Sequence, residues 1–331
     1  MIMNKMFTAA LAAVTALSAC SSGGSNSSGG SNVVSRSGNS PAETVLAENG
    51  GTAAMALDDK STLRASQRAS SQWTRNFDTQ TAALSADSSA TIRRNDAGGL
   101  DLTIGGQTFS FSSADVTDDG YGFQLPDGSA GIWTWSADSM AEALDPAFPN
   151  HQLVFDYYAD FSESGGVNGF AVIGTEAAVA ALANLPTATF SGYARIRLAP
   201  QTGFTNWDNS VSEADGSVSL TANFGSGTVS GAITNIEGRA PFTEDPDRTW
   251  TALDGEVTMA EAAITGNGFT GGLSGDAAFT ANVGTLDPGS SYSGTFFGEN
   301  ADEVAGGINL TGADPDGGKF LGFGFWRAYK N

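Results

Sequence analysis

Cysteine and histidine, which often act as nucleophiles, proton carriers and metal ligands, each occur once in this chain of 331 residues, as Cys20 and His151. His151 follows Pro149 and Asn150 at the start of an expected strand. It is either a haem or metal ligand or an ordinary loop residue, and we favour the loop residue. The acidic clusters lack the alternating oxygen ligands of a calcium loop, and no Ser–His pair has a recognisable spacing. The sequence therefore predicts a protein that is not an enzyme and that has no cofactor or metal site.

Two aromatic residues, Phe204 and Trp207, lie in the longest polar insertion of the C-terminal half, residues 200–216. Exposed aromatic side chains on a loop often anchor a protein ligand. The alternative is that both rings fold back onto the rim of the domain that carries the loop. We single out Phe204 and Trp207 as candidate ligand-binding residues, and the sequence leaves both alternatives open.

The residues before Cys20 have the pattern of an export signal. Lys5 is the only charged residue there, and it is followed by an apolar run, residues 6–17. The run has about 12 residues, whereas a membrane-spanning helix needs roughly 20. Leu17-Ser18-Ala19-Cys20 resembles the lipobox of bacterial lipoproteins, which implies cleavage after a signal peptide of residues 1–19 and attachment of lipid (palmitate among the acyl groups) to Cys20. Ser21, in the place where Asp would imply inner-membrane retention, favours the outer membrane.

The segment after Cys20 contains only Ser, Gly and Asn over residues 21–32. Such a composition is typical of a flexible chain, so we expect residues 20–41 to form a lipidated, disordered tether with a reach of roughly 25 Å. Residues 42–97 are rich in Ala, Ser, Thr and Arg, and we expect a partly helical lead-in there, with a helix within 52–75.

The charge of the chain limits its partners. It has 36 acidic and 15 basic residues, a net charge of −21. Nucleic acids and anionic lipid surfaces are bound through clusters of Lys and Arg, so both are excluded as expected ligands. With a single cysteine, no disulfide can form within the chain, and stability must come from the burial of apolar side chains.

Short strands are expected from residue 98 onward. Apolar and aromatic runs alternate with Gly, Asp and Pro, which is the pattern of strands and turns. Trp133 and Trp135 lie two residues apart and would share a face of one strand. Short helices are expected at 139–144 and 176–184. Residues 98–186 are therefore predicted to form a small β-rich domain, which we call the handle.

The final domain, residues 187–331, is predicted to be a closed β-barrel. Eight antiparallel strands with mostly short turns close into an up-and-down barrel, and closure leaves no exposed strand edge. The predicted strands are about 187–198, 217–224, 227–236, 255–264, 268–279, 291–298, 303–311 and 319–329. The fold class is thus mainly β, with a disordered tether, a handle and an eight-stranded barrel in that order.

One face of the predicted barrel strands alternates small and large apolar residues, which fits an interior filled by side chains. The residues expected to point inward are Gly192, Ala194, Ile196, Leu198, Val218, Leu220, Ala222, Phe224, Val229, Gly231, Ile233, Phe269, Gly271, Leu273, Gly275, Tyr292, Gly294, Phe296, Val304, Gly306, Ile308, Leu310, Leu321, Phe323 and Phe325. The opposite face, with Tyr193, Arg195 and Arg197, is more polar. A membrane-spanning barrel shows the reverse pattern.

Three segments of the barrel resemble a known family. They are Thr187-Ala-Thr-Phe-Ser-Gly192, the hairpin from Tyr292 to Gly307, and the Gly-Phe-Gly-Phe-Trp run that ends at Trp326. Together they resemble the β-barrel domain of transferrin-binding protein B and related surface lipoproteins, over about 187–331. The order of lipobox, tether, handle and barrel is similar as well, although this chain has a single handle–barrel pair where the two-lobed members have two.

The resemblance implies a lipoprotein of the outer membrane, exposed at the cell surface, that binds a host or environmental protein, haem or a metal carrier during nutrient acquisition of the iron type. It also implies a TonB-dependent receptor and a surface-lipoprotein translocator as partners. No ligand-contacting residue can be transferred from the family to this sequence. The alternative function is that of a structural or envelope-accessory lipoprotein without a small ligand.

Overall fold

The computed structural model describes residues 62–63, 71–76, 78–84, 90–104, 106–145, 150–162, 165–206, 210–241 and 244–331. The predicted signal peptide, Cys20, the tether and Trp207 lie outside these residues. Within the described ranges, no helix is long and apolar enough to cross a membrane.

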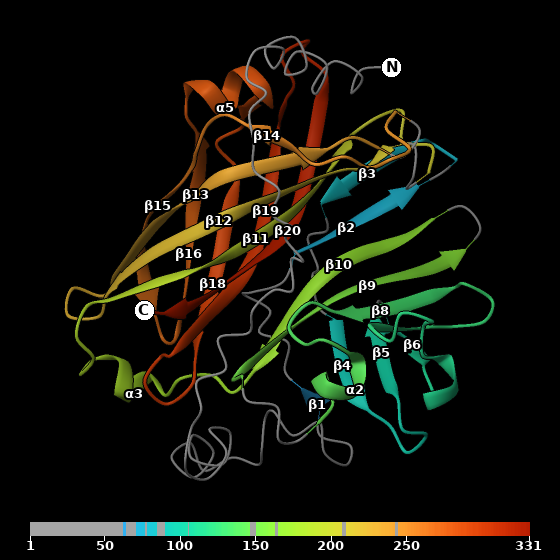
Figure 1. Ribbon diagram of the computed structural model, residues 1–331, viewed down its shortest axis with the longest axis horizontal. Helices are drawn as coiled ribbons and strands as arrows, with labels where there is room; N and C mark the ends of the chain where they lie inside the picture. Colours follow the sequence, from blue (N-terminus) through green and yellow to red (C-terminus); the bar gives the residue numbers. More distant parts are fainter. Residues whose placement is uncertain are drawn as a thin grey trace, which may run out of the picture.

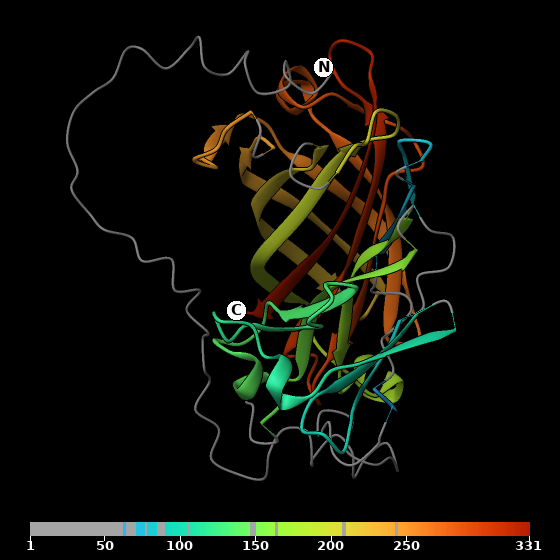
Figure 2. The same cartoon turned by 90° about the vertical axis from the view of Figure 1, so that its right-hand side faces the viewer.

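The C-terminal domain is a closed antiparallel barrel of eight main strands, as predicted (Figures 1 and 2). The strands are β11 (Ala188–Pro200), β12 (Ser212–Asn223), β13 (Thr228–Arg239), β15 (Val257–Thr265), β16 (Gly268–Gly275), β18 (Ser291–Phe297), β19 (Glu303–Ala313) and β20 (Lys319–Lys330). Each pairs with the next, and β20 pairs with β11 to complete the ring. Two short strands, β14 (Thr251–Leu253) and β17 (Thr285–Leu286), pair with β13 and β19.

Two strand boundaries in the barrel differ from the prediction by four or five residues, more than the others do. Strand β16 ends at Gly275, and the helix α5 (Ala277–Asn282) replaces the expected end of the strand at 279. The Asp276 carboxylate accepts a hydrogen bond from the Phe279 amide at 2.7 Å, which is the N-cap arrangement that starts a helix. Strand β12 begins at Ser212, within the segment that was expected to be a polar insertion.

The barrel interior is filled by its own side chains. The buried Phe296 ring contacts three other rings there, with centroids 5.1 Å from Phe224, 5.3 Å from Phe269 and 6.0 Å from Phe190. A residual cavity lined by apolar residues that include Ile196, Leu198 and Val257 encloses only about 20 Å³, room for about one water. This agrees with the predicted packed interior and leaves no space for a ligand in that part of the barrel.

The predicted orientation of β20 is wrong. Leu321, Phe323 and Phe325 were expected inside the barrel, but they face outward and pack against the handle, whereas Phe320 and Trp326 point into the barrel core. The error has a physical cause. Both faces of β20 are covered, one by the barrel interior and one by the handle, so both are apolar and the alternation of side chains does not identify the inner face.

The handle contains two antiparallel sheets with a core between them. One sheet has the order β1 (Thr62–Leu63), β4 (Ala90–Arg94), β5 (Leu100–Ile104) and β6 (Gln107–Ser110), and the other has the order β3 (Thr81–Leu84), β2 (Ser71–Asn76), β10 (Gly165–Gly174), β9 (Gln152–Ser162), β8 (Ala130–Thr134) and β7 (Gly122–Gln124). Three short helices accompany the sheets: the 3₁₀ helix η3 (Ser113–Asp115), α2 (Met140–Ala143) and α3 (Val179–Leu182). Helices α2 and α3 lie within the helices expected at 139–144 and 176–184.

The described part of the lead-in is strand, not helix. Residues 62–63 and 71–75 of the helix expected at 52–75 belong to β1 and β2, and the other residues of that range lie outside the described ones. The handle therefore starts before residue 98. Strand β2 is held by pairing with β10, about 90 residues later in the chain. Such tertiary pairing overrides a weak local preference for helix.

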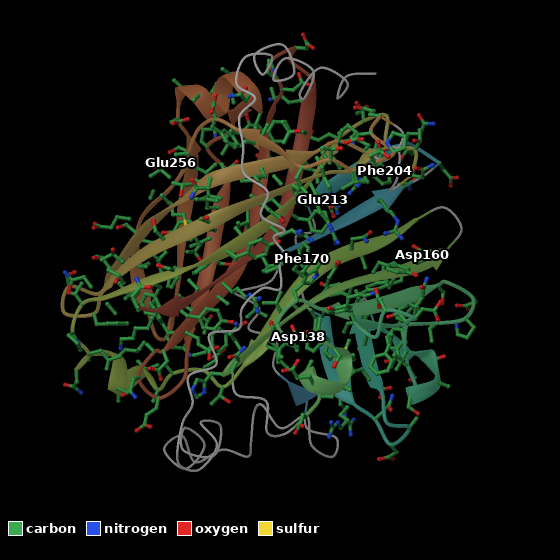
Figure 3. The ribbon with its side chains drawn as sticks, viewed as in Figure 1. Asp138, Asp160, Phe170, Phe204, Glu213 and Glu256 are labelled. Carbon is green, nitrogen blue, oxygen red and sulfur yellow. The ribbon has the colours of Figure 1, made fainter. Side chains whose placement is uncertain are left out.

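The handle and the barrel share an apolar layer that includes Phe170, which is labelled in Figure 3. The Phe170 ring of β10 lies 5.6 Å from the Phe323 ring and 5.0 Å from the Phe325 ring of β20. Polar contacts border this layer. The buried Glu303 carboxylate of β19 accepts hydrogen bonds from the backbone amides of His151, at 2.9 Å, and Gln152, at 3.1 Å. The two domains are therefore docked through a continuous buried interface.

Candidate functional site

Buried ion pairs lie where β11 of the barrel meets the handle. The Arg197 guanidinium donates to both carboxylate oxygens of Asp156, on β9, at 2.7 and 2.5 Å. It also donates to Glu213, on β12, at 3.3 Å. Arg239 and Arg248 donate to the other Glu213 oxygen, at 2.6 and 2.8 Å. We call these five residues the Glu213 network; Glu213 is labelled in Figure 3.

The charges of the Glu213 network hold one another in their ionised forms. Burial by itself raises the pKa of Glu213, but the positive charges of Arg197, Arg195 and Arg239 outweigh burial and lower this pKa to about 2. Burial opposes the charge on Arg197, and the neighbouring Asp156 carboxylate outweighs it, so the pKa of Arg197 is raised. The network is therefore a fixed electrostatic connection between handle and barrel.

Beside the network, a cavity of about 460 Å³ opens between the handle sheet and the barrel. This volume is within the range of roughly 300–1,000 Å³ that is common for small-molecule sites. We call it the junction cavity. Its lining residues come from β2, β8, β9, β10 and β11 and from the position after β8; they are Arg75, Trp133, Trp135, Asp156, Tyr158, Asn168 and Arg197.

The floor of the junction cavity includes two aromatic rings that lie flat on the sheet. The Trp133 and Tyr158 rings are inclined by only 22°, with centroids 5.7 Å apart. They lie over Gly131, where a Cβ would stand 2.4 Å from the Trp133 ring and 2.8 Å from the Tyr158 ring. A Cβ at Gly122 would also meet the indole, at 2.4 Å. The two glycines thus let the rings form a flat surface, which we call the aromatic shelf.

The Tyr158 hydroxyl fixes one end of the shelf. It donates to the Gly128 carbonyl and accepts from the Gln124 amide nitrogen, both at 3.0 Å. Burial raises the pKa of Tyr158, so the phenol is neutral at physiological pH. The hydroxyl therefore positions the ring.

Paired charges border the shelf. The Arg75 side chain, 7% exposed, forms an ion pair with Asp160 and donates to the Asn168 side-chain oxygen. Burial lowers the pKa of Arg75 to about 10, so it remains charged at neutral pH. Across the cavity, Asp156 is paired with Arg197. The border therefore offers hydrogen-bonding groups of both signs but little net charge.

Trp135 forms the side of the cavity next to the barrel. The Arg195 guanidinium carbon lies 4.3 Å from the centre of the indole, within cation–π range, and the Phe325 ring is 6.0 Å away. The indole N–H is buried and has no hydrogen-bond partner in the described part of the chain. Trp135 is thus held by the stacking of its ring.

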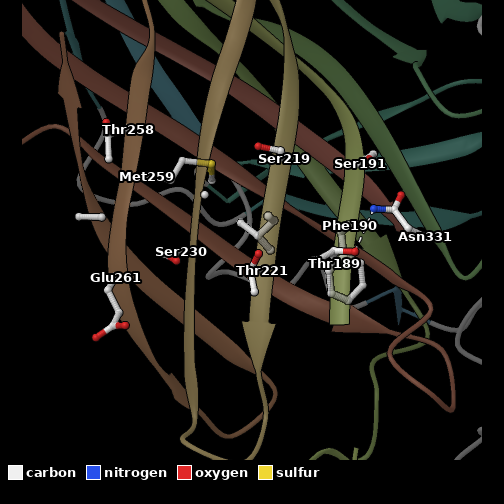
Figure 4. A pocket seen from close by; sticks show the side chains of 13 residues that line it. Thr189, Phe190, Ser191, Ser219, Thr221, Ser230, Thr258, Met259, Glu261 and Asn331 are labelled. Atoms are coloured by element: carbon white, nitrogen blue, oxygen red, sulfur yellow. Dashed lines mark hydrogen bonds between the residues drawn. The ribbon is translucent and has the colours of Figure 1, made fainter. Parts of the chain in front are cut away.

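A second hollow lies on the outer wall of the barrel and encloses about 390 Å³ (Figure 4). Hydroxyl side chains dominate its labelled lining, among them Ser191, Ser219, Thr221 and Thr258. Asn331 reaches it from the C-terminus and donates to the Thr189 hydroxyl at 3.1 Å. Glu261 is its only charged residue. It lacks the buried charges and stacked rings of the junction cavity, which is therefore the better candidate site.

The structure places the residues singled out from the sequence as follows. Phe204 is 0% exposed and packs in the apolar layer between barrel and handle, which favours the alternative that this ring folds back onto the barrel. Trp207 and Cys20 lie outside the described residues. His151 is buried against Gly298 at the start of β9, not on an open loop. In the described ranges, no group of three or more His, Cys, Asp or Glu side chains is arranged to hold a metal ion.

The junction cavity was not predicted as a site. The pair Trp133 and Trp135 was noted as sharing a strand face, and both do line the cavity. Asp156 and Asn168 are polar interruptions in strands that are otherwise mostly apolar, which is a signal that was available in the sequence. Their partners, Arg197 and Arg75, come from distant strands and carry no local signal.

Comparison with known proteins adds a family match for the barrel. Residues 184–322 match the family described as the C-lobe and N-lobe β-barrels of Tf-binding protein B. Among curated proteins, none matches the chain.

Among solved structures, the chain is similar to a transferrin binding protein B double mutant from Haemophilus parasuis, with 16% identity, over 79% of this chain and 45% of that one (TM-score 0.43). The isotype 1 transferrin binding protein B from serogroup B Neisseria meningitidis has 14% identity, over 80% of this chain and 43% of that one (TM-score 0.41). The haemoglobin receptor HpuA from Kingella denitrificans has 12% identity, over 83% of this chain and 90% of that one (TM-score 0.39). The chain thus spans less than half of the length of these transferrin-binding proteins. The family match and the closed eight-stranded ring cover largely the same residues, so the barrel is the part of the chain that is similar to the β-barrels of Tf-binding protein B.

Proposed function

We propose that this protein is a surface-exposed outer-membrane lipoprotein, anchored by lipid on Cys20, that binds a protein, haem or metal-carrier ligand in nutrient acquisition of the iron type. The observation that carries the proposal is the match of residues 184–322 to the barrels of Tf-binding protein B. The lipobox-like sequence before Cys20 and the Ser/Gly/Asn segment after it support the anchor and the tether. A TonB-dependent receptor and a surface-lipoprotein translocator are the partners that this role requires.

The packing of the barrel supports binding at the outer surface. Aromatic side chains such as Phe269, Phe296 and Trp326 occupy the interior, so it cannot serve as a ligand pocket as an open barrel would. The apolar layer around Phe170 and the Glu213 network fix the handle against the barrel. A rigid pair of domains loses little conformational freedom when it binds a large partner, which favours capture of a protein.

Binding of the full chain to immobilised transferrin, haemoglobin and haem–albumin, measured by biolayer interferometry, tests the ligand class. We expect saturable binding to at least one of them. An absence of binding to all three, and to a wider panel of metal carriers, would contradict the proposal and favour a structural or envelope-accessory lipoprotein.

Lipid labelling tests the anchor, and protease treatment of intact cells tests surface exposure. Incorporation of a palmitate analogue is expected in the wild-type chain and absent in Cys20→Ala, and protease treatment of intact cells is expected to remove the handle and barrel. Label retained by Cys20→Ala would refute the assigned lipidation site, and protection of the domain would refute surface exposure.

A further inference from the structure

We propose that the junction cavity binds a neutral sugar residue of a glycan, which stacks on the aromatic shelf of Trp133 and Tyr158. This goes beyond the proposed capture of an iron-type nutrient and does not depend on it. The chemistry is that of a neutral pyranose, carried on a free oligosaccharide or on a glycoprotein.

The shelf gives the first argument. Trp133 and Tyr158 are nearly parallel, and Gly131 beneath them lets both rings lie flat on the strand. The C–H bonds on one face of a pyranose carry partial positive charge, and the face of an aromatic ring is electron-rich, so the two surfaces attract when they stack. A flat pair of rings on an open sheet face suits a ring-shaped, partly apolar ligand.

The border of the shelf gives the second argument. The hydroxyl groups of a sugar project from the ring edge, where they need both donors and acceptors. The border supplies both, through the guanidinium of Arg75, the carboxylate of Asp156 and the amide of Asn168. An entirely apolar ligand would displace water from these groups and offer no hydrogen bonds in its place, and leaving buried polar groups without partners is unfavourable.

The charge of the lining gives the third argument. The two arginines of the lining are both paired with carboxylates, Arg75 with Asp160 and Arg197 with Asp156. An anionic ligand would have to compete with these carboxylates, and a cationic ligand with the arginines. A neutral ligand avoids both costs and can still form charge-assisted hydrogen bonds with the paired groups.

The pairs also preorganise the site. Arg197 reaches Asp156 from the barrel, and Arg75 reaches Asp160 and Asn168 from β2, so the polar groups are held in place before a ligand arrives. The Tyr158 hydroxyl is held by Gly128 and Gln124. Little side-chain freedom remains to be lost on binding, which favours the weak, enthalpy-dominated interactions typical of a single sugar residue.

Saturation-transfer NMR with the full chain, purified in a detergent that lacks a sugar headgroup, tests the proposal. The probes are maltohexaose, cellohexaose, β-mannohexaose and, as a charged comparison, the hexamer of galacturonic acid. Ribonuclease B, which carries an oligomannose glycan, and ribonuclease A, the same polypeptide without it, test for a glycan presented on a protein. We expect transfer to at least one neutral hexamer or binding of ribonuclease B alone, and none to the galacturonate.

Three variants assign the binding to the shelf. Trp133→Ala is expected to weaken binding about tenfold, the effect of losing one stacked ring. Tyr158→Leu removes the second ring of the shelf but keeps an apolar side chain, so it is expected to weaken binding to a similar extent; it tests the shelf even if Trp133→Ala unfolds. Tyr121→Ala, an exposed aromatic residue outside the cavity, is the matched control and should bind as the wild type does.

Several outcomes would overturn the proposal. One is no transfer to any neutral hexamer up to about 10 mM, tenfold above a Kd of ~1 mM, together with no difference in binding between ribonucleases A and B. Preferential binding of the galacturonate would show an anion site instead. Equal affinities of the wild type and a folded Trp133→Ala would place any glycan binding elsewhere.

Discussion

Replacement of Glu213 by Gln removes the negative charge at the centre of the network that joins handle and barrel. The Glu213 side chain is 5% exposed and accepts hydrogen bonds from Arg197, Arg239 and Arg248. Glu213→Gln keeps the size of the side chain but leaves the buried arginines undercompensated. Removing one partner of a buried ion pair typically costs about 3–5 kcal/mol of folding stability.

The pKa of Glu213 gives a second figure for the same interaction. Its depression from 4.5 to about 2 in the folded chain corresponds to about 3 kcal/mol, because one pKa unit is worth about 1.4 kcal/mol. A carboxylate with a lower pKa in the folded state than in the unfolded state stabilises the fold fully above the unfolded value. That contribution is lost as the pH falls from about 4.5 towards 2, where Glu213 becomes protonated.

Urea unfolding of the wild type and Glu213→Gln, measured at several pH values, tests this reasoning. At pH 7 we expect the variant to be less stable by about 3–5 kcal/mol. The difference should shrink as the pH falls through 4.5 towards 2, because the wild type loses the charge of Glu213 there and the variant has no charge at this position to lose. Glu261→Gln, at an exposed carboxylate on β15, is the matched control and should change stability by less than about 0.5 kcal/mol. A difference that does not depend on pH, or that is below about 1 kcal/mol at pH 7, would refute the assigned role of Glu213.

Three further substitutions test the interface and the barrel. Gly306→Ala would place a Cβ 1.7 Å from the Ser293 carbonyl oxygen on the neighbouring strand, and we expect a loss of at least about 2 kcal/mol, seen as a lower Tm; an unchanged Tm would contradict this strand spacing. Glu303→Ala removes the acceptor of the His151 and Gln152 amides, and we expect a loss of about 2–4 kcal/mol with faster hydrogen exchange at those two amides; unchanged exchange would show that another acceptor replaces Glu303. Trp135→Phe removes a buried N–H that has no partner among the described residues, but it also weakens the contact with Arg195. We therefore expect the free energy of unfolding to change by less than about 1 kcal/mol, and a loss above about 2 kcal/mol would show that the N–H is bonded.

The barrel was predictable because most of its strands have one buried face. On β12, for example, Val218, Leu220 and Ala222 are buried and the residues between them are exposed, so the alternation specifies both the strand and its inner side. The same reasoning failed on β20, where Phe323 and Phe325 pack on the handle and Trp326 packs in the barrel. Alternation identifies a strand that faces water on one side, but it does not orient a strand that is covered on both.

The start of β12 was missed because its charges suggested a loop. Glu213 and Asp215 lie directly opposite Arg197 and Arg195 on β11 in the antiparallel register. Opposite charges at directly facing positions stabilise a strand pair, so an Arg-x-Arg sequence followed by a Glu-x-Asp sequence is itself a strand signal. Charge complementarity between neighbouring segments would have placed the strand correctly, whereas hydrophobicity alone could not.

The junction cavity could not be predicted from any single segment, because its parts depend on the docking of the two domains. The aromatic shelf is local to the handle, since Gly131, Trp133 and Tyr158 lie on two paired strands. Asp156 is different, because its partner Arg197 belongs to the barrel. The Asp156 carboxylate can be buried only when Arg197 lies beside it, so this side of the polar border forms only when the handle docks on the barrel. It follows that a variant that weakens docking, such as Glu213→Gln, should weaken glycan binding while leaving the shelf itself intact.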